Sequence, residues 1–441
     1  MSSKFCTGTP PRWRRCRHSR TWSVIVVGLF AALSVAPAGA QGVRFGDVVR
    51  IDGQHLSPFG GRPIAQLALY ACALAACQPI PFQVDEQDAA GHWVLDHGPG
   101  ASPDKRPAVL DENGEMLFMA ADAGERAGRA SLPDAPPAAE IRVHDPLTGS
   151  DRWVYLLAFA GAAPRSPASY VRYDAAHDRV AGAGVRLGFS GGIPDYLAVA
   201  GAAHDGERNL LDRLKVRATA TFLFGLIHFS RSEADLSTEF AGWRQGPIRV
   251  IRNQHQWIRL GWGIHSPTFG SYTYFYRDFA ELPVALRLNF PPTYFFTDIV
   301  IRAVLDFRDL RGWSVLVPSL PQPIPIDGVM TDQKTALNSQ QDSWFALTGP
   351  GITLLNALQV SPSLATTRRR LFYRETGQAQ PPESAPGEEP GIGYQLDQWG
   401  HVGAGRHQLM SVSYALPPGV DARAFVAARE NPLQVEVRVI K

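Results

Sequence analysis

Turns formed by glycine and proline punctuate this chain about every ten residues, as expected for short strands joined by tight turns. The chain has 41 glycines and 35 prolines, and the segments between them alternate apolar and polar residues. The segment 211–222, LDRLKVRATATF, has the period of a strand with one buried face. Further strands are predicted at 151–161, 296–307 and 435–440, and a short helix capped by Asp421. These patterns predict a mainly β fold, an antiparallel β-sandwich or supersandwich with few short helices.

The first forty residues have the pattern of a secretory signal peptide. A basic stretch without acids precedes an apolar run at 24–35, and small residues follow at Ala38 and Ala40, where signal peptidase cleaves. We therefore expect cleavage near Ala40 and a periplasmic or secreted protein. The apolar run is about half the length that spans a bilayer, and no later segment is long enough, so no transmembrane segment is expected after cleavage.

Composition divides the rest of the chain into three parts. We expect an N-terminal β unit at 41–160, a central β-sandwich unit at 161–330 and a C-terminal β part at 331–441. Within the last part, the segment 376–391, TGQAQPPESAPGEEPG, has few apolar residues to bury and is predicted to be a flexible loop.

Cleavage would also change the charge and the cysteine content. The whole chain has 43 basic and 41 acidic residues, and removal of six basic residues leaves 37 against 41. This balance argues against a nucleic-acid partner, which calls for a basic stripe. Of the four cysteines only Cys72 and Cys77 remain, and their spacing fits neither thioredoxin chemistry nor haem attachment. In an exported protein the pair predicts a disulfide that closes a small loop.

Acidic residues cluster near the start of the mature chain. Asp85, Glu86 and Asp88 lie within four positions, in a stretch at 83–125 that has ten acids and two basic residues. Calcium would suit such a cluster because it accepts carboxylate and carbonyl oxygens from irregular loops. The spacing differs from the D-x-D-x-D-G loop, however, and Asp85 and Glu86 should point to opposite faces of a strand. The favoured interpretation is a hairpin with solvated acids, in which Asp88 bonds to its own backbone and Gly91 supplies positive φ.

Two further features belong to the same region. Zinc binding by His92 and His97 is disfavoured, because five residues of irregular chain impose no common ligand geometry. The dipeptide Asn113-Gly114 predicts a second hairpin with a two-residue turn.

Arginine and aromatic residues gather in the central unit. The candidates for ligand binding there are Arg249, Arg252, Trp257, Arg259, Tyr272 and Tyr276. Sugar rings stack on aromatic side chains, and arginine binds the carboxylates of uronic acids through two hydrogen bonds. A lyase would also need a base beside that carboxylate, for which His255, His265 and Tyr274 are candidates. In the alternative interpretation, the tyrosines form the packed face of a sandwich and the arginines are solvated or paired.

A smaller cluster at 394–407 adds Trp399 and His401 as candidate ligand contacts at the edge of a cleft. Elsewhere, His228 is expected in the core because its neighbours are apolar, and Arg368, Arg369 and Arg370 are expected on an exposed edge.

Short motifs of the chain resemble known proteins. The stretches IPFQVDE, LDENGEMLFMAADAGERA and RWVYLLAF resemble the start of a family of exported bacterial proteins of unassigned function. The stretch GWRQGPIRVIRNQHQWIRLGWG resembles a strand of β-supersandwich proteins, which include galactose-mutarotase-like proteins and polysaccharide lyases. The resemblance implies that fold, with a lyase-like or mutarotase-like activity as an expectation. It implies no catalytic residue, because none matches the motifs of these enzymes one by one.

The expected function is that of an exported protein that binds or processes a carbohydrate, such as an acidic polysaccharide, in an aromatic and arginine-lined cleft. The alternative is a non-catalytic envelope scaffold that binds a protein partner. The chain has no G-x-S-x-G, P-loop or H-E-x-x-H motif, which argues against the hydrolases, NTPases and metalloproteases that carry them. Calcium is the only cofactor that the pattern suggests.

Overall fold

The computed structural model describes most of the chain after the predicted signal peptide. The described residues are 43–74, 76–101, 108–199, 208–222, 225–261, 263–266, 268–375 and 389–440. The predicted signal peptide and residues 376–388 of the predicted loop lie outside them.

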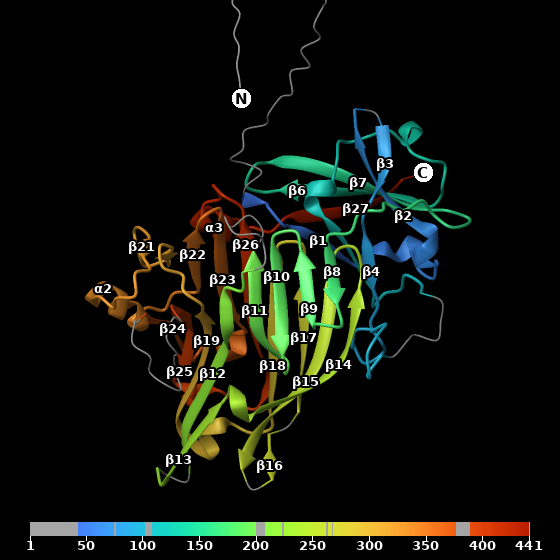
Figure 1. Ribbon diagram of the computed structural model, residues 1–441. Coiled ribbons are helices and arrows are strands. Elements are labelled where there is room, and N and C mark those ends of the chain that lie inside the picture. The colour runs from blue at the N-terminus through green and yellow to red at the C-terminus, as the bar shows by residue number, and fades with distance from the viewer. Residues whose placement is uncertain are drawn as a thin grey trace, which may run out of the picture. The chain divides into compact units, whose positions relative to one another are not determined.

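The largest element is an antiparallel sheet of ten strands (Figure 1). Its order is β14 (Leu236–Gln245), β15 (Val250–Gly261), β17 (Phe269–Phe275), β18 (Phe279–Leu288), β26 (Gly405–Leu416), β23 (Ile352–Val360), β22 (Trp344–Gly349), β20 (Ser314–Leu316) and β21 (Ile324–Pro325), with β16 (Ile264–His265) paired to β15. Because β18 pairs with β26, a strand of the expected central unit lies beside one of the expected C-terminal part.

Two further sheets pack on one face of the large sheet, which we call its inner face. One has the order β11 (Ile193–Val199), β10 (Val185–Ser190), β9 (Arg179–Gly182) and β8 (Val171–Asp174). The other, called the five-stranded arginine sheet below, has the order β13 (Ile227–Ser232), β12 (Leu211–Phe222), β19 (Phe296–Phe307), β25 (Gly391–Asp397) and β24 (Arg368–Arg374). Phe307 and Tyr394 of that sheet pack with Phe345 of the large sheet in the main core. The layers therefore form a β-sandwich.

The N-terminal residues form two smaller sheets. One has the order β1 (Val48–Asp52), β5 (Glu115–Met119) and β4 (Gln83–Asp85). The other has the order β27 (Gln434–Ile440), β6 (Ala138–Asp145), β7 (Ser150–Ala158), β2 (Leu67–Ala73) and β3 (Ala76–Ile80). The last strand of the chain thus completes a sheet begun by the first residues, and by its contacts the chain from Gly39 onward forms one unit.

Helices are short, so the predicted fold class is confirmed. Among the described residues, α2 (Asp332–Ala336) and α3 (Ala422–Glu430) are α-helices. The 3₁₀ turns are η1 (Gly53–Phe59), η2 (Ile64–Gln66), η3 (Ala120–Asp122), η4 (Arg129–Ser131), η5 (Glu233–Asp235), η6 (Pro292–Tyr294), η7 (Leu337–Ser339), η8 (Pro362–Leu364) and η9 (Trp399–His401). Asp421 caps α3 as predicted, because its Oδ1 accepts a hydrogen bond of 2.7 Å from the Ala424 amide. None of the helices in the described ranges has the length and apolar character needed to cross a bilayer.

Two local predictions are wrong. The Asn113-Gly114 turn does not join paired strands, since β5 begins at Glu115 and pairs with β1 and β4 instead. Here Asp111 Oδ1 accepts a hydrogen bond of 3.0 Å from the Asn113 amide, and the distant β1 supplies the strand partner. His228 is exposed on β13 rather than buried, because β13 is an edge strand of its sheet.

The predicted disulfide between Cys72 and Cys77 is present and joins directly opposed residues of β2 and β3. Closing a loop this short restricts the unfolded chain, an effect of about 2 kcal/mol. Cys72→Ala/Cys77→Ala should therefore lower the free energy of unfolding by about 2 kcal/mol, measured by urea denaturation. Equal unfolding curves for the variant and the parent under oxidising conditions would contradict this expectation.

Candidate functional site

The predicted cleft in the central unit does not gather its two main arginines. Arg249 and Arg252 lie three residues apart along an extended segment, and their side chains therefore point to opposite faces of the large sheet. Arg252 is buried on the inner face, where its Nη2 lies 2.6 Å from Asp178 Oδ2 and its guanidinium covers the Phe189 ring. Arg249 is buried on the other face, called the outer face.

Asp85 is the centre of the buried cluster on the outer face. Its carboxylate accepts hydrogen bonds from Arg249 Nε at 2.6 Å, Arg244 Nε at 2.8 Å and Gln83 Nε2 at 2.8 Å. The interpretation of a solvated acidic face is therefore wrong for Asp85, which is 0% exposed, and for Glu86, which is 5% exposed. The partners of Asp85 are Arg244 of β14 and Arg249 just before β15, about 160 residues later in the chain.

Asp88 behaves as predicted, because it is exposed and its Oδ1 accepts hydrogen bonds of 2.9 Å from the amides of Ala90 and His92. Gly91 has the positive φ expected at this turn. Within the described ranges, no three His, Cys, Asp or Glu side chains are placed to hold a metal ion together.

The tyrosines of the predicted cleft belong to the same buried cluster. Tyr276 is buried and accepts a hydrogen bond of 2.8 Å from Arg50 Nη2. Tyr274 accepts one of 2.8 Å from Trp93 Nε1 and stacks on Tyr272, with 6.5 Å between ring centroids. Burial raises the pKa of Tyr274, which keeps the phenol protonated. The cluster thus packs two layers together, in keeping with the alternative interpretation of the tyrosines.

Of the other predicted site residues, Trp257, Arg259 and His265 lie together where β15 pairs with β16, and His255, Trp399 and His401 lie elsewhere. His255 is exposed on the outer face opposite Gly270, and Trp257 lies 6.5 Å from the ring of His265. Arg259 is exposed and donates to the carbonyl of Ala234. Trp399 is buried in the main core, with His401 exposed beside it.

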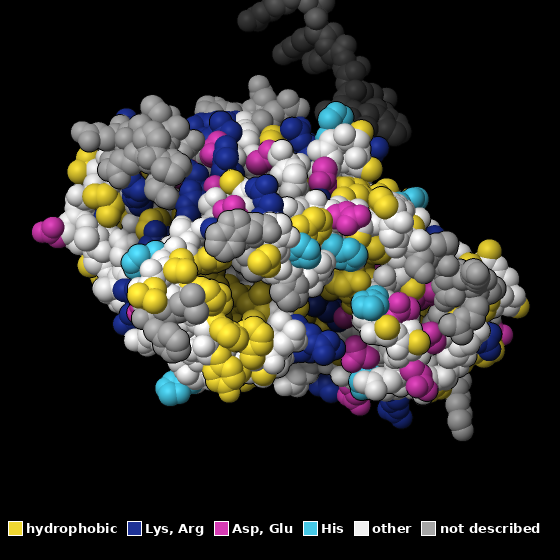
Figure 2. All heavy atoms as spheres, turned by 90° about the horizontal axis from the view of Figure 1, so that it is seen from below, with side chains coloured by type: hydrophobic (Ala, Val, Ile, Leu, Met, Phe, Trp, Pro, Cys, Tyr) yellow, Lys and Arg dark blue, Asp and Glu magenta, His cyan; other side chains and the backbone are white. Residues whose placement is uncertain are grey.

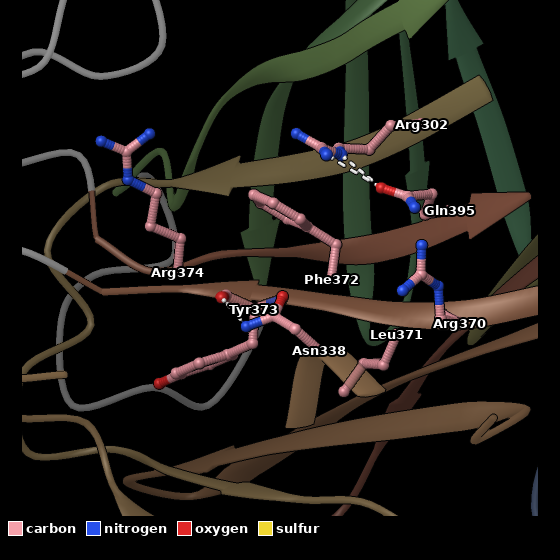
Figure 3. A pocket seen from close by; sticks show the side chains of 8 residues that line it. All are labelled: Arg302, Asn338, Arg370, Leu371, Phe372, Tyr373, Arg374 and Gln395. Carbon is pink, nitrogen blue, oxygen red and sulfur yellow. Dashed lines mark hydrogen bonds between the residues drawn. The ribbon is translucent and has the colours of Figure 1, made fainter. Parts of the chain in front are cut away.

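A second arginine cluster lies on the five-stranded arginine sheet and borders a groove of about 500 Å³. We call it the arginine groove. Its lining residues are Arg302, Asn338, Arg370, Leu371, Phe372, Tyr373, Arg374 and Gln395. Figure 3 shows Arg302, Phe372, Arg374 and Gln395 projecting to the same side of β19, β24 and β25. A volume of 500 Å³ lies within the range of small-ligand sites.

Strand register explains why arginines meet there. Arg302 of β19 lies opposite Gln395 of β25, which in turn lies opposite Arg370 of β24. In the next row Val304 lies opposite Gly393, and Gly393 opposite Phe372. A Cβ at Gly393 would lie 2.0 Å from the carbonyl oxygen of Ala303, so this position of the floor requires glycine. The absence of a side chain at Gly393 leaves space on the floor of the groove between β19 and β24.

The guanidinium of Arg302 is held in one orientation. It lies 4.3 Å from the centroid of the Phe372 ring and donates hydrogen bonds of 2.8 and 3.2 Å to Gln395 Oε1. Arg370 Nη2 lies 2.6 Å from Asp397 Oδ2, and Arg368 Nε lies 2.8 Å from Asp397 Oδ1. Such preorganised guanidinium groups suit the binding of an anion.

Three arginines, Arg302, Arg370 and Arg374, are among the residues that line the groove. Arg302, Arg368, Arg370 and Arg374 share one face of two strands, with Asp397 as the acid bonded to two of them. Burial opposes ionisation of Asp397, but hydrogen bonds from Arg368, Gln395 and Arg370 outweigh it and lower the pKa of this carboxyl. Asp397 therefore remains ionised at neutral pH and holds Arg368 and Arg370 in place.

Asn338 secures the edge of the groove. Its Oδ1 accepts a hydrogen bond of 2.9 Å from the Tyr373 amide, and its Nδ2 donates one of 3.0 Å to the Tyr373 carbonyl. The Tyr373 hydroxyl points away from the groove and donates to Glu375 Oε2 at 2.5 Å. Burial and the Glu375 carboxylate raise the pKa of Tyr373, so this phenol also stays protonated.

Sequence reasoning missed this groove. Arg368 to Arg370 were expected on an exposed edge; β24 is an edge strand, but these residues are half-buried. The usable signal was the alternation in RRRLFYR, which places residues 368, 370, 372 and 374 on one face of a strand. Nothing in the local sequence indicates that Arg302 joins them.

Comparison with known proteins supplies no family. No protein-family model and no curated protein matches the chain. The fold is similar to that of an α-mannosidase from Enterococcus faecalis V583, at 8% identity and a TM-score of 0.44 over 89% of this chain. It is also similar to a candidate aldose 1-epimerase from Escherichia coli K12, at 9% identity and a TM-score of 0.32 over 53% of this chain. The similarity covers 44% of the first of these proteins and 96% of the second.

Proposed function

We propose that the protein binds an acidic carbohydrate in the arginine groove. The observation that carries the proposal is the set of three arginines, Arg302, Arg370 and Arg374, that line one cavity of about 500 Å³. The proposal keeps the ligand class expected from the sequence and moves its site from residues 249–276 to β19, β24 and β25. Its alternative, a scaffold that binds a protein partner, predicts no affinity for a sugar polymer.

Arginine geometry supports a polymeric anion as the ligand. Arg368, Arg370 and Arg374 lie on one face of β24, and alternate residues of a strand are about 6.8 Å apart. A chain of uronic acids carries a carboxylate on every sugar, so several carboxylates can meet arginines at once. Gln395 and Asn338 are engaged with Arg302 and with the backbone of Tyr373, so they position the site. Anion contacts are therefore assigned to the arginines.

Calorimetric titration with polygalacturonate tests the proposal. The variant Arg370→Gln/Arg374→Gln should bind at least about a hundredfold more weakly, because each charged hydrogen-bond donor contributes about 1.5–3 kcal/mol. Binding by the parent protein should also weaken as salt is added, since ions screen exposed charges. Arg172→Gln provides the matched control, because Arg172 is exposed on β8, outside the arginine sheet.

Three results would contradict the proposal. They are equal affinity for neutral dextran, equal weakening in the Arg172→Gln control, and no binding of polygalacturonate by the parent protein. A thermal melt of each variant separates lost binding from lost folding, since Arg370 also pairs with Asp397.

We also propose that the chain is exported and cleaved near Ala40. The Cys72–Cys77 disulfide supports an oxidising compartment, where such bonds persist. N-terminal sequencing of the protein from a periplasmic extract tests this, and an uncleaved Met1 terminus would contradict it.

A further inference from the structure

Large apolar side chains protrude from three neighbouring turns, which we call the apolar tips. The first tip, between β12 and β13, exposes Leu226 and Ile227. The second exposes Ile264 in β16, and the third, between β18 and β19, exposes Phe290, Tyr294 and Phe295. Exposed fractions reach 82% for Leu226, 70% for Tyr294 and 59% for Ile264, so these side chains contribute little to the core.

The tips lie at the same end of the sandwich. Phe296, next to the third tip, packs on Phe222 and Phe229 beside the first, with ring centroids 5.2 and 5.9 Å away. Arg231 Nε of β13 donates a hydrogen bond of 2.8 Å to the carbonyl of Arg259 in β15, the strand that pairs with β16. Figure 1 places β13 and β16 at the bottom of the molecule, and Figure 2, viewed from below, shows apolar side chains gathered around a hollow.

The described tip residues carry basic side chains only, and the nearest acids in sequence are Glu233 and Asp298. The described residues 225–232, 263–266 and 288–297 contain no aspartate or glutamate. They contain Arg231, His228 and His265, and Arg259 lies directly behind the first two tips. An apolar surface whose own charged side chains are cationic complements a surface that is apolar inside and anionic outside. The headgroup layer of an acidic bilayer has this chemistry.

From these features we infer that the apolar tips dock the protein on the surface of an anionic lipid bilayer. A protein partner would require a continuous packed interface core. Separate protruding tips fit a fluid lipid surface better, because lipids can surround each tip. Tyrosine and phenylalanine at the third tip are residue types that favour the boundary between headgroups and acyl chains. Insertion of the tips alone requires no membrane-spanning segment.

Vesicle flotation with the mature protein, from Gln41 onward, tests the inference. The parent protein should float with phosphatidylglycerol–phosphatidylethanolamine vesicles and much less with pure phosphatidylcholine vesicles. Leu226→Ser/Ile264→Ser/Tyr294→Ser should lower the partition coefficient about tenfold or more, because three apolar anchors are lost. Leu147→Ser/Val329→Ser/Val439→Ser is the matched control, since it changes three comparably exposed apolar residues outside the tips and should bind like the parent.

The inference is overturned if the parent protein stays with neither vesicle, or if the control variant loses as much binding as the tip variant. It is also overturned if the tips instead pair two copies of the chain. Light scattering would then show a dimer, and the tip variant would be a monomer that floats as well as the parent does. Arg370→Gln/Arg374→Gln should float like the parent. Failure of the carbohydrate proposal therefore leaves this one unaffected.

Discussion

Asp85→Asn should lower the free energy of unfolding by about 3–5 kcal/mol, the cost of leaving buried charges without their partner. The Asp85 carboxylate is 0% exposed and accepts hydrogen bonds from the Nε atoms of Arg249 and Arg244. Asparagine has the same shape but presents an uncharged amide to two guanidinium groups. Arg249 is itself buried, so water cannot replace the lost carboxylate. Urea denaturation of the parent and the variant measures the difference.

Asp88→Asn is the matched control, three residues along the same hairpin. Asp88 is exposed and bonds to local backbone amides, so its replacement should change the free energy of unfolding by less than about 0.5 kcal/mol. The proposed role of Asp85 in joining β4 to the large sheet is refuted if both variants unfold at the same urea concentration.

Lys334→Met should also lower the free energy of unfolding by about 3–5 kcal/mol, through a buried ion pair far from Asp85 in the sequence. Lys334 is 2% exposed, and its Nζ lies 2.6 Å from Asp327 Oδ1 and 2.8 Å from Glu375 Oε2. Glu375 is 0% exposed, so loss of the ammonium leaves a buried carboxylate without its cation. The measurement is again the free energy of unfolding in urea.

A double-mutant cycle isolates this pair. Lys334→Met/Glu375→Gln removes both charges and should cost less than the sum of the single variants, with a coupling of about 0.5–3 kcal/mol. Additive effects would show that the two charges do not stabilise each other. Gln333→Ala, at an exposed position of α2, should remain within about 0.5 kcal/mol of the parent.

The ion pairs of Asp85 with Arg244 and Arg249 show how far a local sequence predicts the burial of a charge. Asp85 and Glu86 follow Val84 in a hairpin, and this local pattern is the same for a solvated turn and for a buried ion pair. Arg244 and Arg249 lie about 160 positions later, and only packing of β4 against the large sheet brings them to Asp85. Local sequence therefore predicted the turn at Asp88 correctly and the environment of Asp85 wrongly.

The same distinction applies to the arginines. Arg249 and Arg252 are close in sequence, yet the period of two in a strand sends them to opposite faces. That separation could be predicted from their spacing. Arg302, Arg370 and Gln395 come from three strands, and their meeting depends on the pairing of β19 with β25 and of β25 with β24.

Sequence alone determined the mainly β class, the positions of the four strands β7, β12, β19 and β27, the cap of α3 and the pairing of Cys72 with Cys77. Each of these depends on side chains a few residues apart, so a local pattern carries the necessary information. Tertiary structure decided which charges are buried, where the arginines meet and which apolar turns protrude together. Alternation determines which residues share a strand face, whereas strand order and register determine which faces meet, and these arise only when distant segments pack.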